Sequence, residues 1–90
     1  MEITIPVSED ERVSTLDAIL KLNEIQHLRS MSQAMISETA NIKATKMRVI
    51  LTDLIKRNLI TQYQVSDNKH IQRYYYTLTD AGRALIKDKE

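Results

Sequence analysis

The basic side chains of this chain gather in one segment. Residues 43–73 contain seven basic and two acidic residues, whereas residues 1–42 contain three basic and seven acidic ones. The formal net charge of the whole chain is only +1, so the imbalance is local. A positive segment in a nearly neutral protein suits a polyanionic partner, although a solvated surface with a chance asymmetry would look the same. The basic residues of the segment are Lys43, Lys46, Arg48, Lys56, Arg57, Lys69 and Arg73.

Residues 43–57 carry the clearest helical pattern in the sequence. Apolar residues recur at intervals of three and four positions and form one face, consisting of Met47, Ile50, Leu51 and Leu54. At about 100° per residue, the opposite face presents Thr45, Val49, Thr52 and Lys56, with Lys46 and Arg48 beside them. The pattern predicts a helix with one buried face and one basic outer face.

A helix with this outer face fits the major groove of DNA, which admits one α-helix. Arg48 could read a guanine edge through two hydrogen bonds, and Val49 or Thr45 could contact a thymine methyl group. Lys43 and Lys46 lie near the helix N-terminus, where side chains and backbone amides together suit phosphate groups. The alternative is an ordinary solvated face. Val49 favours the groove, because it is apolar at a position without a role in the core.

Catalytic and metal-binding arrangements are missing from the sequence. There is no Cys, and His27 and His70 belong to different predicted elements without other ligands at metal-binding spacing. The only glycine, Gly82, cannot build a nucleotide-binding loop. We therefore expect neither an enzyme nor a cofactor. We also expect a cytoplasmic protein without a membrane partner, because neither a membrane-spanning run nor a signal peptide is present.

A length of 90 residues predicts one domain. Residues 1–7 alternate as an extended arm, and Ser8 with Glu11 fits a capping box at the start of a helix. Its apolar positions are Val13, Leu16, Ile19 and Leu20. Asn23 is the expected stop, and residues 24–30 fit either a helical extension or a buried connector.

Asparagine replaces glycine as the turn residue of this chain, since Asn also tolerates a positive φ. The apolar pattern breaks at each of the four asparagines, which are Asn23, Asn41, Asn58 and Asn68. Ser32 is expected to cap a short helix that ends at Ala40 before the turn at Asn41. Asn58 is expected to end the helix that begins at residue 43.

Strand-forming residues at 61–66 and 70–79 flank the polar stretch Asp67-Asn68-Lys69, which predicts a β-hairpin. Thr79 is expected to cap a last helix, anchored by Leu85 and Ile86.

Three consecutive tyrosines lie in the second strand of this hairpin. Tyr74 and Tyr76 are in phase with Leu78, so we expect both in the core, with Tyr75 exposed. Stacking on single-stranded nucleic acid is the less favoured interpretation.

The stretch MSQAMISETANIKATKMRVILTDLIKRNLI resembles the helix-turn-helix of winged-helix regulators, particularly the MarR-like and PadR-like proteins of bacteria and archaea. Ser37 stands where these proteins prefer a small residue. Asn41-Ile42 and Asn58-Leu59-Ile60 replace their usual Gly-Ile and Gly-Leu-Ile. The closing stretch YYYTLTDAGRALI is similar to their Leu-Thr-x-x-Gly-Arg signature. The resemblance covers residues 31–86 and implies a mainly α fold with a small β-hairpin wing, in the order α-α-α-β-β-α.

The resemblance implies an N-terminal arm at residues 1–7 and a single winged-helix domain at 8–90, with the helix-turn-helix at about 32–57 and the wing at about 60–79. It also implies a DNA-binding transcriptional regulator, acting on double-stranded DNA as a homodimer. Helix 43–57 would enter the major groove, and the wing would contact the backbone or the minor groove. The expected DNA-contacting residues are Lys43, Thr45, Lys46, Arg48, Val49, Thr52, Lys69, His70 and Arg73.

Two surfaces are expected to be available for dimerisation, the arm at 1–7 and the apolar face of helix 9–22. The alternative function is a winged-helix protein–protein interaction module in a larger complex, with residues 1–30 as the surface for a protein partner. The positive segment coincides with the groove-facing helix and the wing, and this coincidence favours DNA because an interaction module does not need it.

Overall fold

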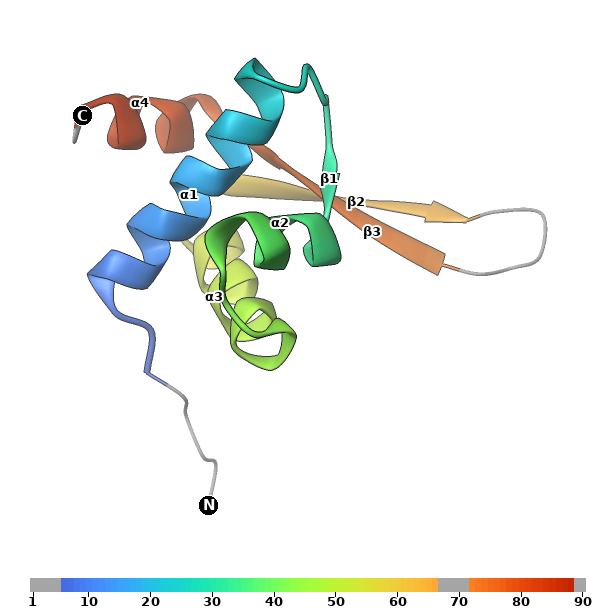
Figure 1. The fold of residues 1–90 in the computed structure, drawn as a ribbon, viewed down its shortest axis with the longest axis horizontal. Helices are drawn as coiled ribbons and strands as arrows, with labels where there is room; N and C mark the ends of the chain where they lie inside the picture. The colour runs from blue at the N-terminus through green and yellow to red at the C-terminus, as the bar shows by residue number, and fades with distance from the viewer. Residues whose placement is uncertain (1–5, 67–71, 89–90) are drawn as a thin grey trace.

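The computed structural model describes residues 6–66 and 72–88, so that 1–5, 67–71 and 89–90 lie outside the described part. Along the described residues the elements are α1 (Glu9–Glu24), β1 (Met31–Ser32), α2 (Gln33–Ala40), α3 (Ala44–Lys56), β2 (Ile60–Ser66), β3 (Gln72–Leu78) and α4 (Asp80–Asp88) (Figure 1). The predicted succession of helices and hairpin strands is confirmed. The short strand β1 is an addition that no local pattern indicated.

The first helix begins as predicted but ends later. The Glu11 backbone N–H donates to Ser8 Oγ at 3.1 Å and the Ser8 N–H donates to Glu11 Oε1 at 2.9 Å, which completes the capping box. Asn23 lies inside α1, and its side-chain amide donates to the Leu28 carbonyl at 2.9 Å. The left-handed backbone position after the helix belongs to His27 instead, with a φ of 57°. Predicting a helix stop at Asn23 was therefore wrong.

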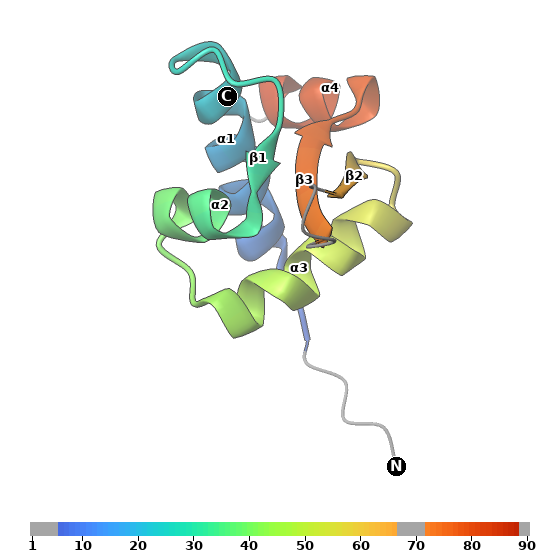
Figure 2. The same cartoon turned by 90° about the vertical axis from the view of Figure 1, so that its right-hand side faces the viewer.

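β3 is the central strand of a three-stranded antiparallel sheet in the order β1-β3-β2 (Figure 2). Met31 pairs with Tyr76, and Ser32 with Tyr75. This pairing joins segments that are far apart in the sequence, which explains why β1 was not predicted. The hairpin of β2 and β3 extends well beyond the helices (Figure 1).

The core lies between the helices and the sheet face that they cover. Its fully buried hydrophobic residues are Leu16, Ile19, Met31, Ile36, Met47, Ile50, Leu51, Leu54 and Ile86. The apolar side of α1 is thus used inside the domain. Our interpretation of that side as a dimerisation surface was wrong, because its apolar residues already pack against the other elements.

The last helix is tied to the turn between α3 and β2. Thr79 Oγ1 accepts the Gly82 N–H at 3.0 Å and donates to the Asn58 carbonyl at 2.8 Å, so the predicted cap is confirmed. Asn58 has the expected positive φ, 61°. Arg83 Nη2 donates to Asn23 Oδ1 at 3.1 Å and so connects α4 to α1. The Gly-Arg pair of the signature therefore has a structural role.

Candidate nucleic-acid interface

The connection between α2 and α3 is fixed by local hydrogen bonds. Ser32 Oγ accepts the Met35 N–H at 3.3 Å and caps α2, as predicted. Asn41 has left-handed backbone angles, φ 57° and ψ 46°, which end α2 and redirect the chain. Gln33 Nε2 reaches across to the Ala44 carbonyl at 2.9 Å. These contacts position the start of α3 relative to α2.

The third helix has the two faces that the sequence predicted. Its buried residues are Met47, Ile50, Leu51 and Leu54. On the outer side Thr45, Arg48, Thr52 and Lys56 are exposed, and Val49 is half-buried. The helix therefore presents a polar, basic face while its apolar face anchors it in the core.

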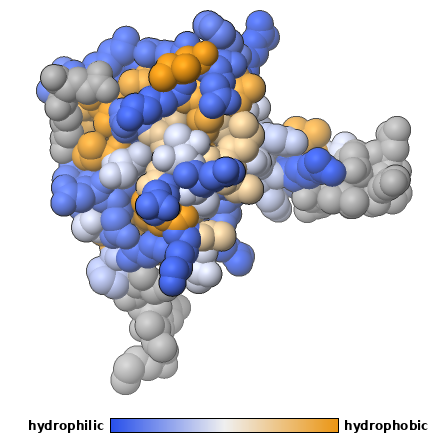
Figure 3. Space-filling view, in the orientation of Figure 1, coloured by the Kyte–Doolittle hydropathy of each residue, from blue (hydrophilic) through white to orange (hydrophobic). Residues whose placement is uncertain are grey.

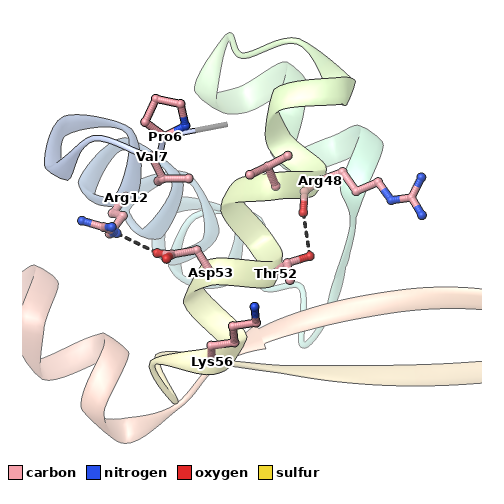
Figure 4. A pocket seen from close by; sticks show the side chains of 8 residues that line it. Pro6, Val7, Arg12, Arg48, Thr52, Asp53 and Lys56 are labelled. Carbon is pink, nitrogen blue, oxygen red and sulfur yellow. Dashed lines mark hydrogen bonds and ion pairs between the residues drawn. The ribbon is translucent and has the colours of Figure 1, made fainter. Parts of the chain in front are cut away.

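Arg48 and Thr52 form a ridge along this outer face, with a groove on either side. Thr52 Oγ1 donates to the Arg48 carbonyl at 2.9 Å. The arm groove, of about 480 Å³, lies between the ridge and residues 6–7 and 12 (Figure 4). The wing groove, of about 510 Å³, lies between the ridge and the hairpin residues Gln62 and Tyr74. Only the ridge borders both grooves among the described residues.

Val49 has apolar neighbours that the sequence did not indicate. It lines the arm groove together with Pro6 and Val7, the two described residues of the arm. Its apolar character thus has a second explanation, which is partial cover from the arm. Contact with a thymine methyl group remains a prediction for this residue.

The two lysines near the start of α3 differ in their surroundings. Lys43 is the exposed N-cap residue and makes no side-chain capping bond. Lys46 Nζ donates to the Pro6 carbonyl and lies 3.5 Å from Glu11 Oε2, which ties it to the arm and to α1. Lys46 would have to leave these partners to contact a phosphate, whereas Lys43 would not. The hydrogen bond from the Ser8 N–H lowers the pKa of Glu11, although desolvation of the carboxylate acts in the opposite direction. The positive charge of Lys46 lowers this pKa further.

Asp53 is the acidic residue of α3, and its carboxylate forms ion pairs with two arginines. Arg12 Nε donates to Asp53 Oδ2 at 2.7 Å (Figure 4). Arg57 Nε donates to the same oxygen at 3.0 Å. Partial burial raises the pKa of Asp53, but the hydrogen bonds from Arg12 and then Arg57 outweigh it, so that the pKa lies below its ordinary value. The bond to Arg12 also fastens α3 to α1.

Acid should weaken this link between α1 and α3. Because the pKa of Asp53 is lower in the folded chain, the ionised carboxylate stabilises the fold fully above the ordinary pKa of about 4, and this contribution is lost as the pH falls from there through the lower folded pKa. Asp53→Asn should cost about 1 kcal/mol of unfolding free energy at pH 7, and the difference from the wild type should shrink towards pH 3. Urea unfolding of both proteins at the two pH values measures this.

A matched control is Asp17→Asn, which removes the ion pair of 2.8 Å between the half-buried Asp17 and the exposed Lys21 inside α1. Its effect should be smaller, since an i,i+4 ion pair within one helix contributes only about 0.3–0.5 kcal/mol and does not link two helices. A constant difference between Asp53→Asn and the wild type from pH 7 to pH 3 would contradict the role given to the carboxylate.

Comparison with solved structures identifies the architecture. The chain is similar to a MepR mutant from S. aureus with a TM-score of 0.69 at 20% identity, covering 88% of this chain and 53% of that one. It is similar to Bacillus subtilis PadR in complex with operator DNA, with a TM-score of 0.70 at 19% identity, covering 86% and 44%. A PadR family transcription regulator from Clostridium difficile gives a TM-score of 0.68 at 19% identity, covering 87% and 80%.

The fold is a winged helix-turn-helix. Helices α2 and α3 are the helix-turn-helix, and β2 with β3 is the wing. This chain spans only about half the length of the MepR and PadR structures that it matches. Neither a protein-family model nor a curated protein matches it.

The wing carries the remaining predicted contact residues. Arg73 is exposed on β3, opposite Val65 of β2 in the strand register. Lys69 and His70 lie outside the described residues. A contact of any of the three with DNA stays a prediction.

The predicted arrangement of the tyrosines is partly wrong. Tyr76 is buried, as expected, but Tyr74 is 43% exposed and Tyr75 is half-buried. Tyr74 lies opposite Gln64 and Tyr76 opposite Gln62, so Tyr74 is nearer to the end of the hairpin that extends beyond the helices (Figure 1). Tyr75 is the register partner of both Ser32 and Tyr63, since β3 is the central strand. The exposure of each tyrosine therefore depends on its position along and within the sheet, and not only on which face of β3 its side chain occupies.

Gln33, Gln62 and Tyr74 line the wing groove and were not among the predicted contact residues. Ile60, Gln62 and Gln64 lie two residues apart along β2. Residues at this spacing in a strand share one face, so the sequence could have indicated that Gln62 and Gln64 lie on the same face as Ile60. Gln33 comes from another element, and only the folded chain brings it beside the wing. All three offer hydrogen-bonding groups next to the Arg48–Thr52 ridge.

Neither a metal site nor a membrane-spanning helix is found in the described part of the chain. It contains no group of three or more His, Asp or Glu side chains placed to hold a metal ion. None of its helices combines the length and the apolar character that crossing a bilayer requires.

Proposed function

We propose that this winged helix binds double-stranded DNA as a transcriptional regulator, with α3 in the major groove and the wing against the flanking backbone. The observation that carries the proposal is the Arg48–Thr52 ridge. Arg48 is exposed and, within the described residues, forms no ion pair, so its guanidinium can meet a guanine edge or a phosphate. The similar fold of PadR, which is in complex with operator DNA, supports DNA as the partner.

The charges around the ridge support the same conclusion. Lys43, Arg48 and Lys56 are exposed along α3, and Arg73 is exposed on the wing. The acidic residue of α3, Asp53, is paired with two arginines and does not present a bare carboxylate. A phosphate backbone therefore meets mainly positive charge on this side.

We further propose that two copies act together on a palindromic site, with their α3 helices about 34 Å apart to match one turn of DNA. In this role the chain binds and does not catalyse. The proposed contact residues are the nine predicted from the sequence, with Lys46 released from Glu11 on binding. Gln33 and Gln62 are added as groups that face the DNA beside the ridge.

Duplex binding in a salt series tests the proposal. Fluorescence anisotropy with a labelled random-sequence duplex should show binding at low salt, with a log–log slope of about −0.9 for each phosphate neutralised. Single-stranded DNA of the same length is the control and should bind more weakly. Absence of duplex binding at low salt would overturn the proposal and favour the protein-interaction module, with residues 1–30 as the surface to examine.

A further inference from the structure

The outer edge of β2 is uncovered in the described part of the structure. β3 pairs with one side of β2, and none of the described strands, whose order is β1-β3-β2, lies on its other side. Residues 61–66 are all exposed, and β2 contains no charged residue and no proline. Such an edge presents unpaired backbone N–H and C=O groups, which proteins normally protect with lysine, proline or a bulge. β2 is therefore ready to accept another strand.

The sequence of β2 is nearly symmetric about its central residue. Ile60–Ser66 reads ITQYQVS, with Tyr63 in the middle, a glutamine on either side, and the similarly shaped Thr61 and Val65 beyond. Two antiparallel copies of this strand, related by a two-fold axis at Tyr63, place glutamine opposite glutamine and Thr61 opposite Val65. In a two-fold contact each residue meets the partner position at equal distance from the axis, so the pairs Gln62–Gln64 and Thr61–Val65 bring only uncharged side chains together.

We propose that a second copy of this chain pairs with β2 edge to edge, joining the two sheets across a two-fold axis at Tyr63. Like charges do not meet in this register, because β2 is uncharged. The contact is self-complementary and closed, as expected for a homodimer. Further growth stops there, since the edge that remains on each copy, β1, is only the two residues Met31–Ser32.

Side chains on the outer face of the wing strengthen this pairing. Tyr63 is 49% exposed and Val65 is 50% exposed, and apolar surface is visible on the wing (Figure 3). Tyr63 lies opposite Tyr75 within one copy. In the dimer these two and their counterparts in the second copy form a row of four tyrosines across four strands. Aromatic cross-strand pairs are among the more stabilising contacts of a sheet.

The inference deepens the proposed function, because it assigns the surface of the proposed homodimer. Its test does not depend on DNA binding, since the open edge of β2 is available for self-association when no DNA is present. Self-association without DNA and duplex binding are separate measurements, so either can fail while the other holds.

Charge substitutions at Tyr63 test the two-fold axis. Tyr63→Lys and Tyr63→Glu each place like charges opposite one another, and sedimentation of each full-length variant should show a dissociation constant at least tenfold higher than that of the wild type. An equimolar mixture should recover dimers, because opposite charges then meet across the axis. Ile25→Lys, at a residue 71% exposed and away from the wing, should dimerise like the wild type. Thermal unfolding checks that all variants are folded.

Disulfide cross-linking tests the register. The chain has no cysteine, so an added one has no competitor. Directly opposite residues of antiparallel strands have Cα atoms about 4.5–5.5 Å apart, which a disulfide can bridge. Tyr63→Cys should cross-link with itself, Thr61→Cys only with Val65→Cys, and Ser66→Cys not with itself. A wild type that stays monomeric at high concentration, or cross-links that ignore this register, would overturn the proposal.

Discussion

Arg48→Glu should weaken duplex binding about 100-fold at low salt, which corresponds to about 2.7 kcal/mol. The substitution removes a charge-assisted contact of about 1–3 kcal/mol and adds repulsion from the phosphates. Arg48 is exposed on the ridge that borders both grooves, so that its loss disturbs the centre of the proposed interface. Anisotropy titrations of wild type and variant against the same duplex measure the effect. The binding constant of the variant should also depend less steeply on salt concentration than that of the wild type.

Arg29→Glu is the matched control for this experiment. Arg29 is also exposed, and it lies in the connection between α1 and β1, on the side of the domain away from α3 (Figure 1). Both substitutions change the net charge by the same amount, so any general loss of attraction is equal in the two variants. If Arg29→Glu weakens binding as much as Arg48→Glu does, the ridge on α3 is not the contact surface.

Gly82→Ala should destabilise the fold by at least about 3 kcal/mol. A Cβ atom at this position would lie 2.0 Å from the Leu59 carbonyl oxygen and 3.3 Å from Leu78 Cδ2. The oxygen belongs to the backbone of the turn between α3 and β2, and it also accepts the Thr79 N–H at 3.1 Å, so that it cannot move freely. Alanine favours helix by about 1 kcal/mol over glycine, which is too little to offset the clash.

Ala84→Gly provides the control, because Ala84 is an exposed residue of the same helix. It should cost only the difference in helix propensity, about 1 kcal/mol. Urea unfolding of both variants separates the two effects. A Gly82→Ala protein as stable as the wild type would show that α4 can move away from the turn.

Features that depend on neighbouring residues could be predicted from the sequence. The spacing of Met47, Ile50 and Leu54 predicted both faces of α3, because helix periodicity is a local property. The turns at Asn41 and Asn58 followed from the conformational freedom of asparagine where glycine is absent. The order of these elements was enough to indicate the winged helix and its outward basic helix.

Only the tertiary structure decided which side chains are available on that helix. Lys46 is engaged by Pro6 and Glu11, and Asp53 by Arg12, all from segments far away in the chain. The exposure of Tyr74 likewise depends on where the helices stop covering the sheet. The sequence by itself determined the elements and their faces through local periodicity and capping. The folded chain determined the two grooves beside the ridge and the open edge of β2, because each depends on how elements far apart in the sequence pack together.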